Sequence, residues 1–421
     1  MSNCLIMLTN TYPFDGGEYF IENEIEIVSR SFDKVIICAL DANVNDTLTR
    51  DIPSNTAAFI TGMRSRKSER AEDLIRASMN MFFSKGKNIA HDDITDKDFR
   101  KKLFREYFLS RTRRQYRQVM NKLPVEELKK YDRVIIYSYW LFVTANVAVE
   151  IKKKLLSLGI NAEKVISRAH GYDIYEERNP LKYLPEREYL LENLDKVFTC
   201  SKHGEKYLKE KYPSFAGKIS CSFLGTKDYG ISQKSEREIF TIVTCSSLNP
   251  VKRVWRVADA LSLYTGAKSI KWIHIGGSGK KLQKLKTYTE QKLSGKKVTF
   301  EFKGQMTNKQ VNEFYPSNST DMFLNVSESE GVPVSIMEAA SFGIPVMATD
   351  CGGTKEAVEN GVTGKLINKD FSDSELIKEI MEFMSLKRSE IDKMSESSRN
   401  MWMKKYNAEK NYSDFAAKII S

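Results

Sequence analysis

The chain has 421 residues, of which 41% are hydrophobic and 29% charged, so it is long enough for two separate cores and too apolar for a disordered protein. The formal net charge of +11 suits an anionic partner such as nucleic acid, anionic lipid or a phosphorylated small molecule. The first residues lack the basic and apolar regions of a signal peptide, and no apolar stretch reaches the length that spans a membrane.

Short apolar runs alternate with helical patterns along the whole chain. Near-continuous apolar strands separated by helices are typical of parallel sheets that are covered on both faces, which predicts an α/β fold. The expected strands of a first sheet are residues 4–8, 35–39, 134–137, 165–167 and 196–200, and those of a second sheet are 240–245, 272–275, 298–302, 322–326 and 346–349.

A polar stretch separates the two sets of strands. We therefore expect two doubly wound, Rossmann-like domains: an N-terminal domain over residues 1–225, a linker over 226–238 and a C-terminal domain over 239–400. Residues 401–420 are predicted to form a last helix. In folds of this class a ligand binds outside the carboxyl ends of the strands, so we expect an interdomain cleft to hold it.

The segment from about 64 to 122 is charged, poor in strand pattern and not needed for a minimal domain. Within it, residues 97–122 contain ten Lys or Arg against two acids, with aromatic side chains at helical spacing. A basic amphipathic helix of this kind is typical of a surface that lies on an anionic membrane. An ordinary helix that packs through its apolar stripe explains the pattern equally well.

Two segments that follow strands of the first sheet contain residues suited to a ligand. Gly16 and Gly17 permit positive φ and close approach of the backbone to a phosphate or sugar, although a simple strand-to-helix turn would also use them. His170 stands beside a glycine at a strand's carboxyl end, where catalytic groups of α/β proteins gather. The alternative for His170 is a structural histidine with satisfied hydrogen bonds.

The most informative stretch is residues 330–345, in which Glu330 and Glu338 bracket seven residues. Gly331, Val332, Pro333 and Val334 form a small-residue turn that opens a helix, whose unpaired N–H groups and positive dipole end favour an anion. Gly343 is expected to end this helix. Amide groups suit phosphates and carboxylates suit hydroxyls, so the stretch predicts a site for a sugar phosphate.

This element, followed by the segments 339–346 and 350–356, resembles the signature of the retaining GT-B glycosyltransferases of family 4. The resemblance implies that Glu338 binds the nucleotide ribose, that Glu330 lies beside the donor sugar, and that His170 reaches toward that sugar. It also implies the GT-B architecture, in which the last helix, here 401–421, returns to the N-terminal domain. The glycine loop of the family matches Gly16 and Gly17 in position.

The residues after the first strand of the second domain depart from that family. Members usually carry an arginine and then a lysine that bind the donor diphosphate. Lys252 occupies the lysine position, Ser247 stands at the arginine position, and Arg253 is the candidate replacement for the missing charge. A surface lysine without function is the alternative for Lys252.

We interpret the chain as a retaining glycosyltransferase that moves a sugar from a UDP- or GDP-linked donor to a saccharide or lipid-linked acceptor in cell-surface polysaccharide synthesis. The serine at position 247 leaves open a catalytically silent, nucleotide-sugar-binding partner subunit, and another GT-B enzyme such as a nucleotide-sugar epimerase is a further alternative. No metal is expected, since no convincing metal-binding motif occurs, and no nucleic-acid signature is present. Six scattered cysteines suit free thiols in the cytoplasm.

Overall fold

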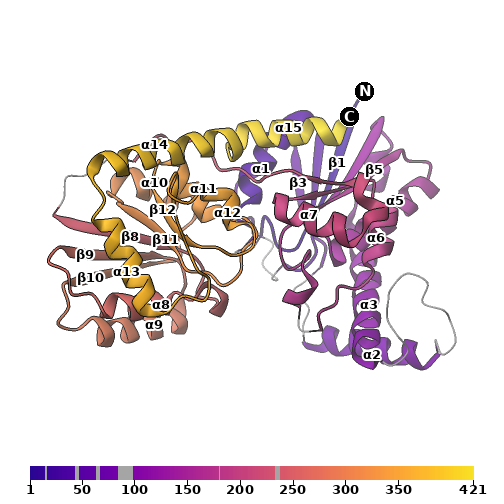
Figure 1. Ribbon diagram of the computed structural model, residues 1–421. Coiled ribbons are helices and arrows are strands. Elements are labelled where there is room, and N and C mark those ends of the chain that lie inside the picture. Colours follow the sequence, from indigo (N-terminus) through magenta and orange to yellow (C-terminus); the bar gives the residue numbers. More distant parts are fainter. Residues whose placement is uncertain (15–16, 43–46, 63–66, 84–97, 180, 233–237) are drawn as a thin grey trace. The chain divides into compact units, whose positions relative to one another are not determined.

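The computed structural model describes every residue except 15–16, 43–46, 63–66, 84–97, 180 and 233–237 (Figure 1). Its contacts divide the chain into two compact units. Unit 1 comprises Met1–Phe223 with Tyr412–Ser421, and unit 2 comprises Leu224–Asn411. None of the described helices is both long enough and apolar enough to cross a membrane.

Unit 1 is built on a parallel sheet in the order β3-β2-β1-β4-β5-β6-β7. Its strands are β1 Asn3–Thr9, β2 Lys34–Ala39, β3 Thr56–Ile60, β4 Arg133–Ser138, β5 Ala162–Ala169, β6 Lys196–Thr199 and β7 Ile219–Cys221. Its helices are α1 Ile21–Val28, α2 Lys67–Phe83, α3 Phe99–Lys122, α4 Val125–Leu128, α5 Val143–Ser157, α6 Arg187–Asn193 and α7 Lys202–Lys211, and the last turns of α15 Ala408–Ile420 belong to it too. Short 3-10 turns occupy Ser29–Ser31, Glu176–Arg178 and Pro213–Lys218.

Alternate residues of the central strands face opposite sides of this sheet. Ile6, Ile36 and Ile136 contribute to the core that includes α3, α5 and α7. On the other side, the hydroxyl of Tyr137 donates to Glu24 on α1, and its ring packs against Phe415 on α15. The sheet is therefore covered on both faces, as the near-continuous apolar strands predict.

Unit 2 is built on a second parallel sheet, in the order β10-β9-β8-β11-β12-β13. Its strands are β8 Ile239–Cys245, β9 Ser269–Ile275, β10 Val298–Gly304, β11 Met322–Asn325, β12 Val346–Thr349 and β13 Gly364–Ile367. Its helices are α8 Trp255–Ser262, α9 Gly279–Leu293, α10 Asn308–Ser317, α11 Val334–Ser341, α12 Thr354–Ala357, α13 Asp373–Met384 and α14 Arg388–Lys405, with a 3-10 turn at Pro250–Lys252. In Figure 1, α8, α9 and α13 lie on one side of this sheet and α10, α11 and α14 on the other.

The described part of the predicted linker belongs to unit 2. Asp228 pairs with Arg399, and Ser232 donates to the carbonyl of Tyr315, so these residues pack on unit 2, while residues 233–237 lie outside the described part of the chain. The predicted C-terminal helix is interrupted. Helix α14 ends at Lys405 and α15 begins at Ala408, because the N–H of Thr226 donates to Tyr406 O and Thr226 O accepts from Ala408 N between them.

The helix predicted over 97–122 forms as α3, and it packs inside unit 1. The side chains of Phe108 and Val119 on α3 are buried in the core, and Arg114 donates to Asp73 of α2 at 2.9 Å. Lys122 donates to the carbonyl of Ile60. The apolar stripe is therefore used for packing from Phe108 onward, whereas Phe99 is exposed, and among the described basic residues of α3 the exposed ones include Arg113 and Arg117.

Candidate functional site

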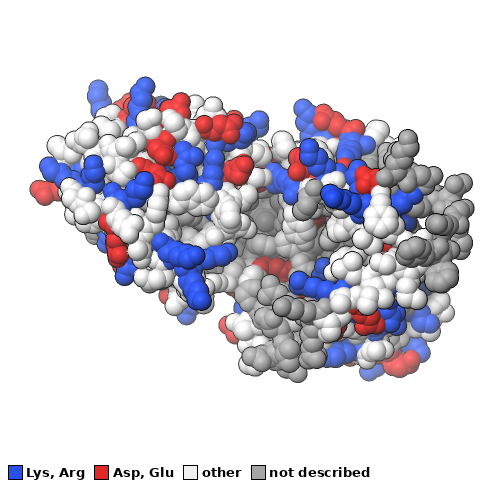
Figure 2. All heavy atoms as spheres, turned by 90° about the horizontal axis from the view of Figure 1, so that it is seen from below, with Lys and Arg blue, Asp and Glu red and all other residues white. Residues whose placement is uncertain are grey.

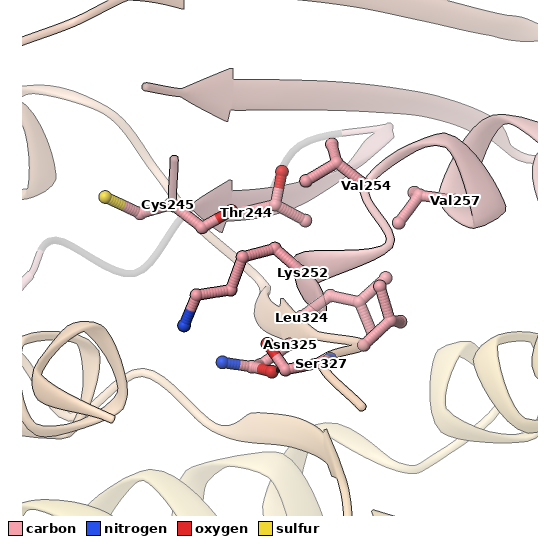
Figure 3. Close-up of a pocket in the computed structure, with 10 residues that line it drawn as sticks. Thr244, Cys245, Lys252, Val254, Val257, Leu324, Asn325 and Ser327 are labelled. Atoms are coloured by element: carbon pink, nitrogen blue, oxygen red, sulfur yellow. Dashed lines mark hydrogen bonds between the residues drawn. The ribbon is translucent and has the colours of Figure 1, made fainter. Parts of the chain in front are cut away.

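The sheet of unit 2 changes its winding direction between β8 and β11. From β8 the chain moves outward through β9 and β10, and from β11 it moves the other way through β12 and β13. Ligands of open α/β sheets bind outside the strand carboxyl ends at such a switch point. A small pocket of about 10 Å³, open to solvent, lies there (Figure 3), and its lining is Thr244, Cys245, Ser246, Lys252, Val254, Val257, Leu324, Asn325, Val326 and Ser327.

A lysine and a carboxylate meet at this pocket. Lys252 ends the 3-10 turn after β8, and its Nζ lies 2.6 Å from Oε1 of Glu330 in the loop after β11. The amide of Asn325, the last residue of β11, donates to the same oxygen at 3.4 Å. The carboxylate side chain is 9% exposed and the lysine 25%, so the pair is only partly screened by water. Two predicted site residues therefore meet, because the loops that carry them follow β8 and β11, which are neighbours in the sheet at the switch point.

Arg253 does not extend into this arrangement. Its Nε donates to the carbonyl of Val326 at 2.8 Å, its Nη2 donates to the carbonyl of Ser327 at 3.3 Å, and its guanidinium lies 4.9 Å from the ring centre of Phe371. Burial lowers the pKa of Arg253. These contacts commit the side chain to the loop that follows β11, so Arg253 positions this loop and is a poor replacement for a diphosphate-binding arginine at position 247.

The turn before α11 is held by close packing of two glycine segments. A Cβ on Gly353, after β12, would lie only 2.2 Å from the carbonyl oxygen of Gly331, so a larger residue at position 353 would displace the turn. Val332 is buried, and Pro333 precedes the first residue of α11, Val334, without any side chain capping the helix. The first N–H groups of α11 are thus available to an anion.

Glu338 lies one turn inside α11, and it is 9% exposed. Burial raises its pKa to about 8. Burial and the nearby charge of Glu338 also raise the pKa of Cys245, which lines the pocket. Tyr315 is fully buried, and its pKa is raised by burial and by the nearby Cys245 and Glu338. Its hydroxyl has no hydrogen-bond partner among the described residues. Unused hydrogen-bonding groups therefore gather beside the pocket.

The segment that carries Ser247 is shaped by the glycine turn after β9. Gly276 has φ +122°, and a Cβ there would lie 2.0 Å from the carbonyl oxygen of Ser246. A Cβ on Gly277 would lie 2.5 Å from Leu248. The glycine turn therefore fits against the β8 loop, and this loop presents an exposed serine where a relative would present arginine.

His170 follows β5 in unit 1, where aromatic rings surround it. Its imidazole lies 4.4 Å from the ring of Trp140 and 4.9 Å from that of Tyr139, measured between centres. Asp173 accepts from the N–H groups of His170, Gly171 and Leu141. Although burial acts to raise it, the pKa of Asp173 is held below its ordinary value by the His170 imidazole and these N–H groups. Nδ1 of His170 lies 3.9 Å from Oδ2 of Asp173, beyond hydrogen-bond distance, and Nε2 has no hydrogen-bond partner among the described residues.

The glycine loop after β1 is described from Gly17 onward, and Gly16 lies outside the described residues. Gly17 has φ +105°, a conformation that favours glycine. Next to it, the buried carboxylate of Glu18 accepts from the N–H groups of Asn10, Thr11 and Tyr12 and from the indole N–H of Trp140. Glu18 therefore fixes the shape of this loop.

Sequence reasoning assigned no role to Asn325, Glu18 or Tyr315. Asn325 lies near the carboxyl end of the predicted strand 322–326, so the sheet order would have indicated it. Glu18 and Tyr315 depend on contacts across the fold, which no local pattern reveals. Among the described residues, no group of three or more His, Cys, Asp or Glu is arranged to hold a metal ion.

Comparison with known proteins identifies a family match in the C-terminal part of the chain and a similar fold over nearly the whole chain. Residues 230–401 match the family described as glycosyl transferases group 1. The O-antigen biosynthesis glycosyltransferase WbnH of Escherichia coli is 36% identical over 91 residues, which are 21% of this chain and 24% of that protein. The putative colanic acid biosynthesis glycosyltransferase WcaL of Salmonella typhimurium is 27% identical over 224 residues, 51% of this chain and 54% of that protein.

A solved structure covers the whole chain. HepE of Anabaena, crystallised in complex with UDP and glucose, matches 99% of both chains with a TM-score of 0.64 and 14% identity. This likeness confirms the predicted fold, two parallel Rossmann-like sheets of the GT-B kind. In sequence, the chain spans only about a quarter to about half of the length of the two curated relatives.

Proposed function

This chain belongs to the glycosyl transferases group 1, retaining family 4, with the family's domain over residues 230–401, and we propose that it transfers a sugar from a nucleotide-sugar donor to a saccharide or lipid-linked acceptor. The proposed setting is the synthesis of a cell-surface polysaccharide. The similarity to WbnH and WcaL, whose names refer to O-antigen and colanic acid, supports this setting.

The observation that carries the proposal is the Lys252–Glu330 pair at the switch point, beside an uncapped helix N-terminus. A diphosphate brings negative charge that Lys252 and the first N–H groups of α11 suit. Donor hydroxyls suit carboxylates, with Glu330 at the loop and Glu338 inside the helix. In this proposal Gly331, Val332, Pro333 and Val334 shape the phosphate-binding turn.

The remaining residues take supporting roles in the proposal. His170 acts on the donor sugar, as the family resemblance implies, and its Nε2, which has no hydrogen-bond partner among the described residues, is consistent with that role. Gly16 and Gly17 give the donor access to the backbone of the β1 loop. Arg253 holds the loop after β11 through the carbonyls of Val326 and Ser327, so it acts on the donor only through the position of Glu330.

The donor is proposed to carry UDP or GDP. The presence of UDP and glucose in the HepE structure makes UDP-glucose the first donor to test. A thermal-shift panel of UDP, GDP, ADP and their sugars identifies the base, since a ligand at 100 times its Kd stabilises the folded protein by about 2.7 kcal/mol. Release of the nucleotide from the donor then tests turnover. Binding without release, for every donor and acceptor mixture, would contradict the enzymatic proposal.

A second candidate function is a catalytically silent subunit that binds a nucleotide sugar. Ser247 favours it, because the fixed positive charge of an arginine is missing from this position and Arg253 is committed elsewhere. Replacing Ser247 with Arg separates the two candidates. A catalyst with a weakened leaving-group site should turn over faster in the variant, whereas a silent subunit should stay silent.

We propose a cytoplasmic protein that can associate with the inner face of the membrane. All six cysteines are free thiols, which suits a reducing compartment. The membrane contact is assigned to the outward cations of α3, since Phe108 of its apolar stripe packs inside unit 1, whereas Phe99 at the start of the helix is exposed. Figure 2 shows Lys and Arg side chains interspersed with acidic ones over the described surface of one face, so attraction to anionic lipid would depend on local groups of cations.

A further inference from the structure

Aromatic rings gather at the carboxyl ends of β4 and β5 in unit 1. Trp140, in the loop after β4, lies 5.0 Å from Tyr172 and 4.4 Å from His170, both in the loop after β5. Phe142 lies 6.1 Å from Tyr172. These distances join the rings of two loops into one group at the edge of the sheet where α/β proteins bind ligands.

The outer part of this group is not buried in the core. Tyr139, at the base of the group, is fully buried, whereas the side chain of Tyr172 is 43% exposed and Trp140 is half-buried. The indole N–H of Trp140 donates to Glu18 at 2.6 Å, and Glu18 is itself held by three backbone N–H groups. The Trp140 ring is therefore fixed in orientation, and the neighbouring Tyr172 ring offers area to a ligand.

A pyranose ring fits the chemistry of such a surface. Its axial C–H bonds form an apolar face that matches the negative face of an aromatic ring, and its hydroxyls require hydrogen-bond partners. Beside Trp140, Nδ1 of His170 faces Asp173 at 3.9 Å, and Nε2 has no hydrogen-bond partner among the described residues. An exposed aromatic face with a polar side chain beside it is an arrangement that recognises a sugar.

We propose that the exposed ring of Tyr172, which Trp140 supports from behind at 5.0 Å, forms a stacking platform for a pyranose of the acceptor saccharide. The assignment to the acceptor rests on the proposed function, in which the groups that hold the nucleotide of the donor belong to unit 2. The stacking itself does not depend on catalysis. A donor sugar has the same ring chemistry, so the experiment contains one arm for each source.

The binding arm uses saturation-transfer NMR with the methyl glycosides of glucose, galactose and N-acetylglucosamine, without any donor. Saturation should be strongest on the C–H protons of one pyranose face for at least one glycoside. Tyr172→Ala and Tyr172→Leu should weaken that binding about tenfold, while Tyr172→Phe, which keeps the ring, should retain it. Tyr229→Ala is the matched control, because Tyr229 has the same 43% exposure in unit 2.

Saturation from none of the three glycosides, or equal affinity in Tyr172→Ala and in the unaltered protein, overturns the platform. The donor arm measures the affinity for UDP-glucose by thermal shift and should show no change in Tyr172→Ala. An equal loss of UDP-glucose affinity would overturn the assignment to the acceptor. If the protein bound glycosides but no nucleotide sugar of the panel, the proposed function would fail while the platform remained.

The kinetic arm follows transfer to the glycoside that binds. Tyr172→Ala should raise the acceptor KM about tenfold and leave kcat and the donor KM nearly unchanged, since stacking binds the ground state and the transition state alike. A fall in kcat with an unchanged acceptor KM would overturn the platform. Melting temperatures of all variants verify that each is folded.

Discussion

Glu338 occupies an unfavourable place for a charge, since α11 is otherwise buried and apolar around it. Burial raises the pKa of a carboxyl group, and here the pKa rises to about 8. The free protein therefore retains much of this group in its protonated form near neutral pH. A ligand that donates hydroxyl hydrogens to the carboxylate would favour its ionised form.

Replacing Glu338 with Gln should weaken nucleotide-sugar binding, because hydrogen bonds to a charged group contribute about 1.5–3 kcal/mol. Calorimetry with the donor found in the thermal-shift panel measures the loss. The melting temperature of the variant serves as the control for folding. Unchanged donor affinity would remove Glu338 from the site.

The same variant should change how stability depends on pH. The folded pKa of Glu338, about 8, exceeds its ordinary value of 4.5, so between these values the folded state keeps a proton that the unfolded state has lost. Stability from this group is therefore full below about pH 4.5 and declines as the pH rises to 8. Because Gln does not titrate, the stability of Glu338→Gln relative to the unaltered protein should be greater at about pH 8 than at about pH 5.5. Urea denaturation at the two pH values measures this difference. If the difference in stability were the same at both pH values, the pKa of Glu338 in the folded protein would be ordinary.

Lys252 is expected to stabilise the diphosphate as it leaves. Lys252→Ala should lower kcat for donor cleavage by about 10²-fold, the typical effect of removing one preorganised stabilising group. Since Glu330 loses its partner at 2.6 Å, the melting temperature must be measured as well. Lys286→Ala, an exposed lysine on α9, is the control. A kcat within a few-fold of the original would exclude this role.

At the candidate site, local pattern and sheet topology act together. Lys252 and Glu330 were predicted from motifs, and they meet because β8 and β11 are neighbours in the sheet. Arg253 was predicted to replace the charge that is missing at position 247, but its backbone is left-handed, with φ +47°, and its side chain donates to the loop carbonyls. That conformation is set by packing and is invisible in the local sequence.

At the scale of elements, the central strands were predicted within a few residues and the missed strands lie at sheet edges. β3 and β7 are the two edges of the first sheet, and β13 is an edge of the second. β7 has three residues and β13 has four, and β3 is half-exposed. Short edge strands bury less apolar surface than central ones, so their sequences carry too weak a pattern to be recognised.

The break between α14 and α15 has a different cause. The segment 401–420 has a helical pattern throughout, and nothing in it predicts an interruption. The backbone of Thr226 takes two hydrogen bonds at the break, and a Cβ on Gly225 would lie 2.5 Å from Cα of Ala408. A contact between positions nearly 200 residues apart decides this boundary, and only the tertiary structure reveals it.

Helix α3 permits a sharper test of membrane contact than its sequence alone. Arg113→Glu with Arg117→Glu should reduce sedimentation with anionic vesicles, and added salt should do the same, because attraction to the headgroups is about 1 kcal/mol per basic residue and is screened. Arg114 must stay, since it pairs with the buried Asp73 and its loss would disturb folding.

The matched control carries the same charge change in unit 2, with Lys280→Glu and Lys281→Glu on α9, where both side chains are exposed. If neither salt nor the two α3 substitutions changed vesicle binding, the cations of α3 would not face lipid. Equal losses in both double variants would point to total charge as the cause.

At the scale of the whole molecule, the chain begins and ends in the same unit. Each unit has its own hydrophobic core, and Tyr412–Ser421 belong to unit 1 although unit 2 precedes them in sequence. Phe415 of α15 is fully buried, and its ring centre lies 4.2 Å from the guanidinium of Arg168, which pairs with Glu24 of α1. The C-terminal residues therefore complete the core of unit 1.

Phe415→Ala should destabilise unit 1 by about 3–5 kcal/mol, the range for removing a buried phenylalanine, and leave unit 2 intact. Native-state hydrogen exchange measures the two units separately, with the amides of β5 reporting on unit 1 and those of β11 on unit 2. Phe383→Ala is the reciprocal variant, because Phe383 is buried in the core of unit 2. It should accelerate exchange in β11 and spare β5. If either substitution accelerated exchange equally in both strands, the two cores would unfold as one cooperative block, and residues 412–421 would not stabilise unit 1 alone.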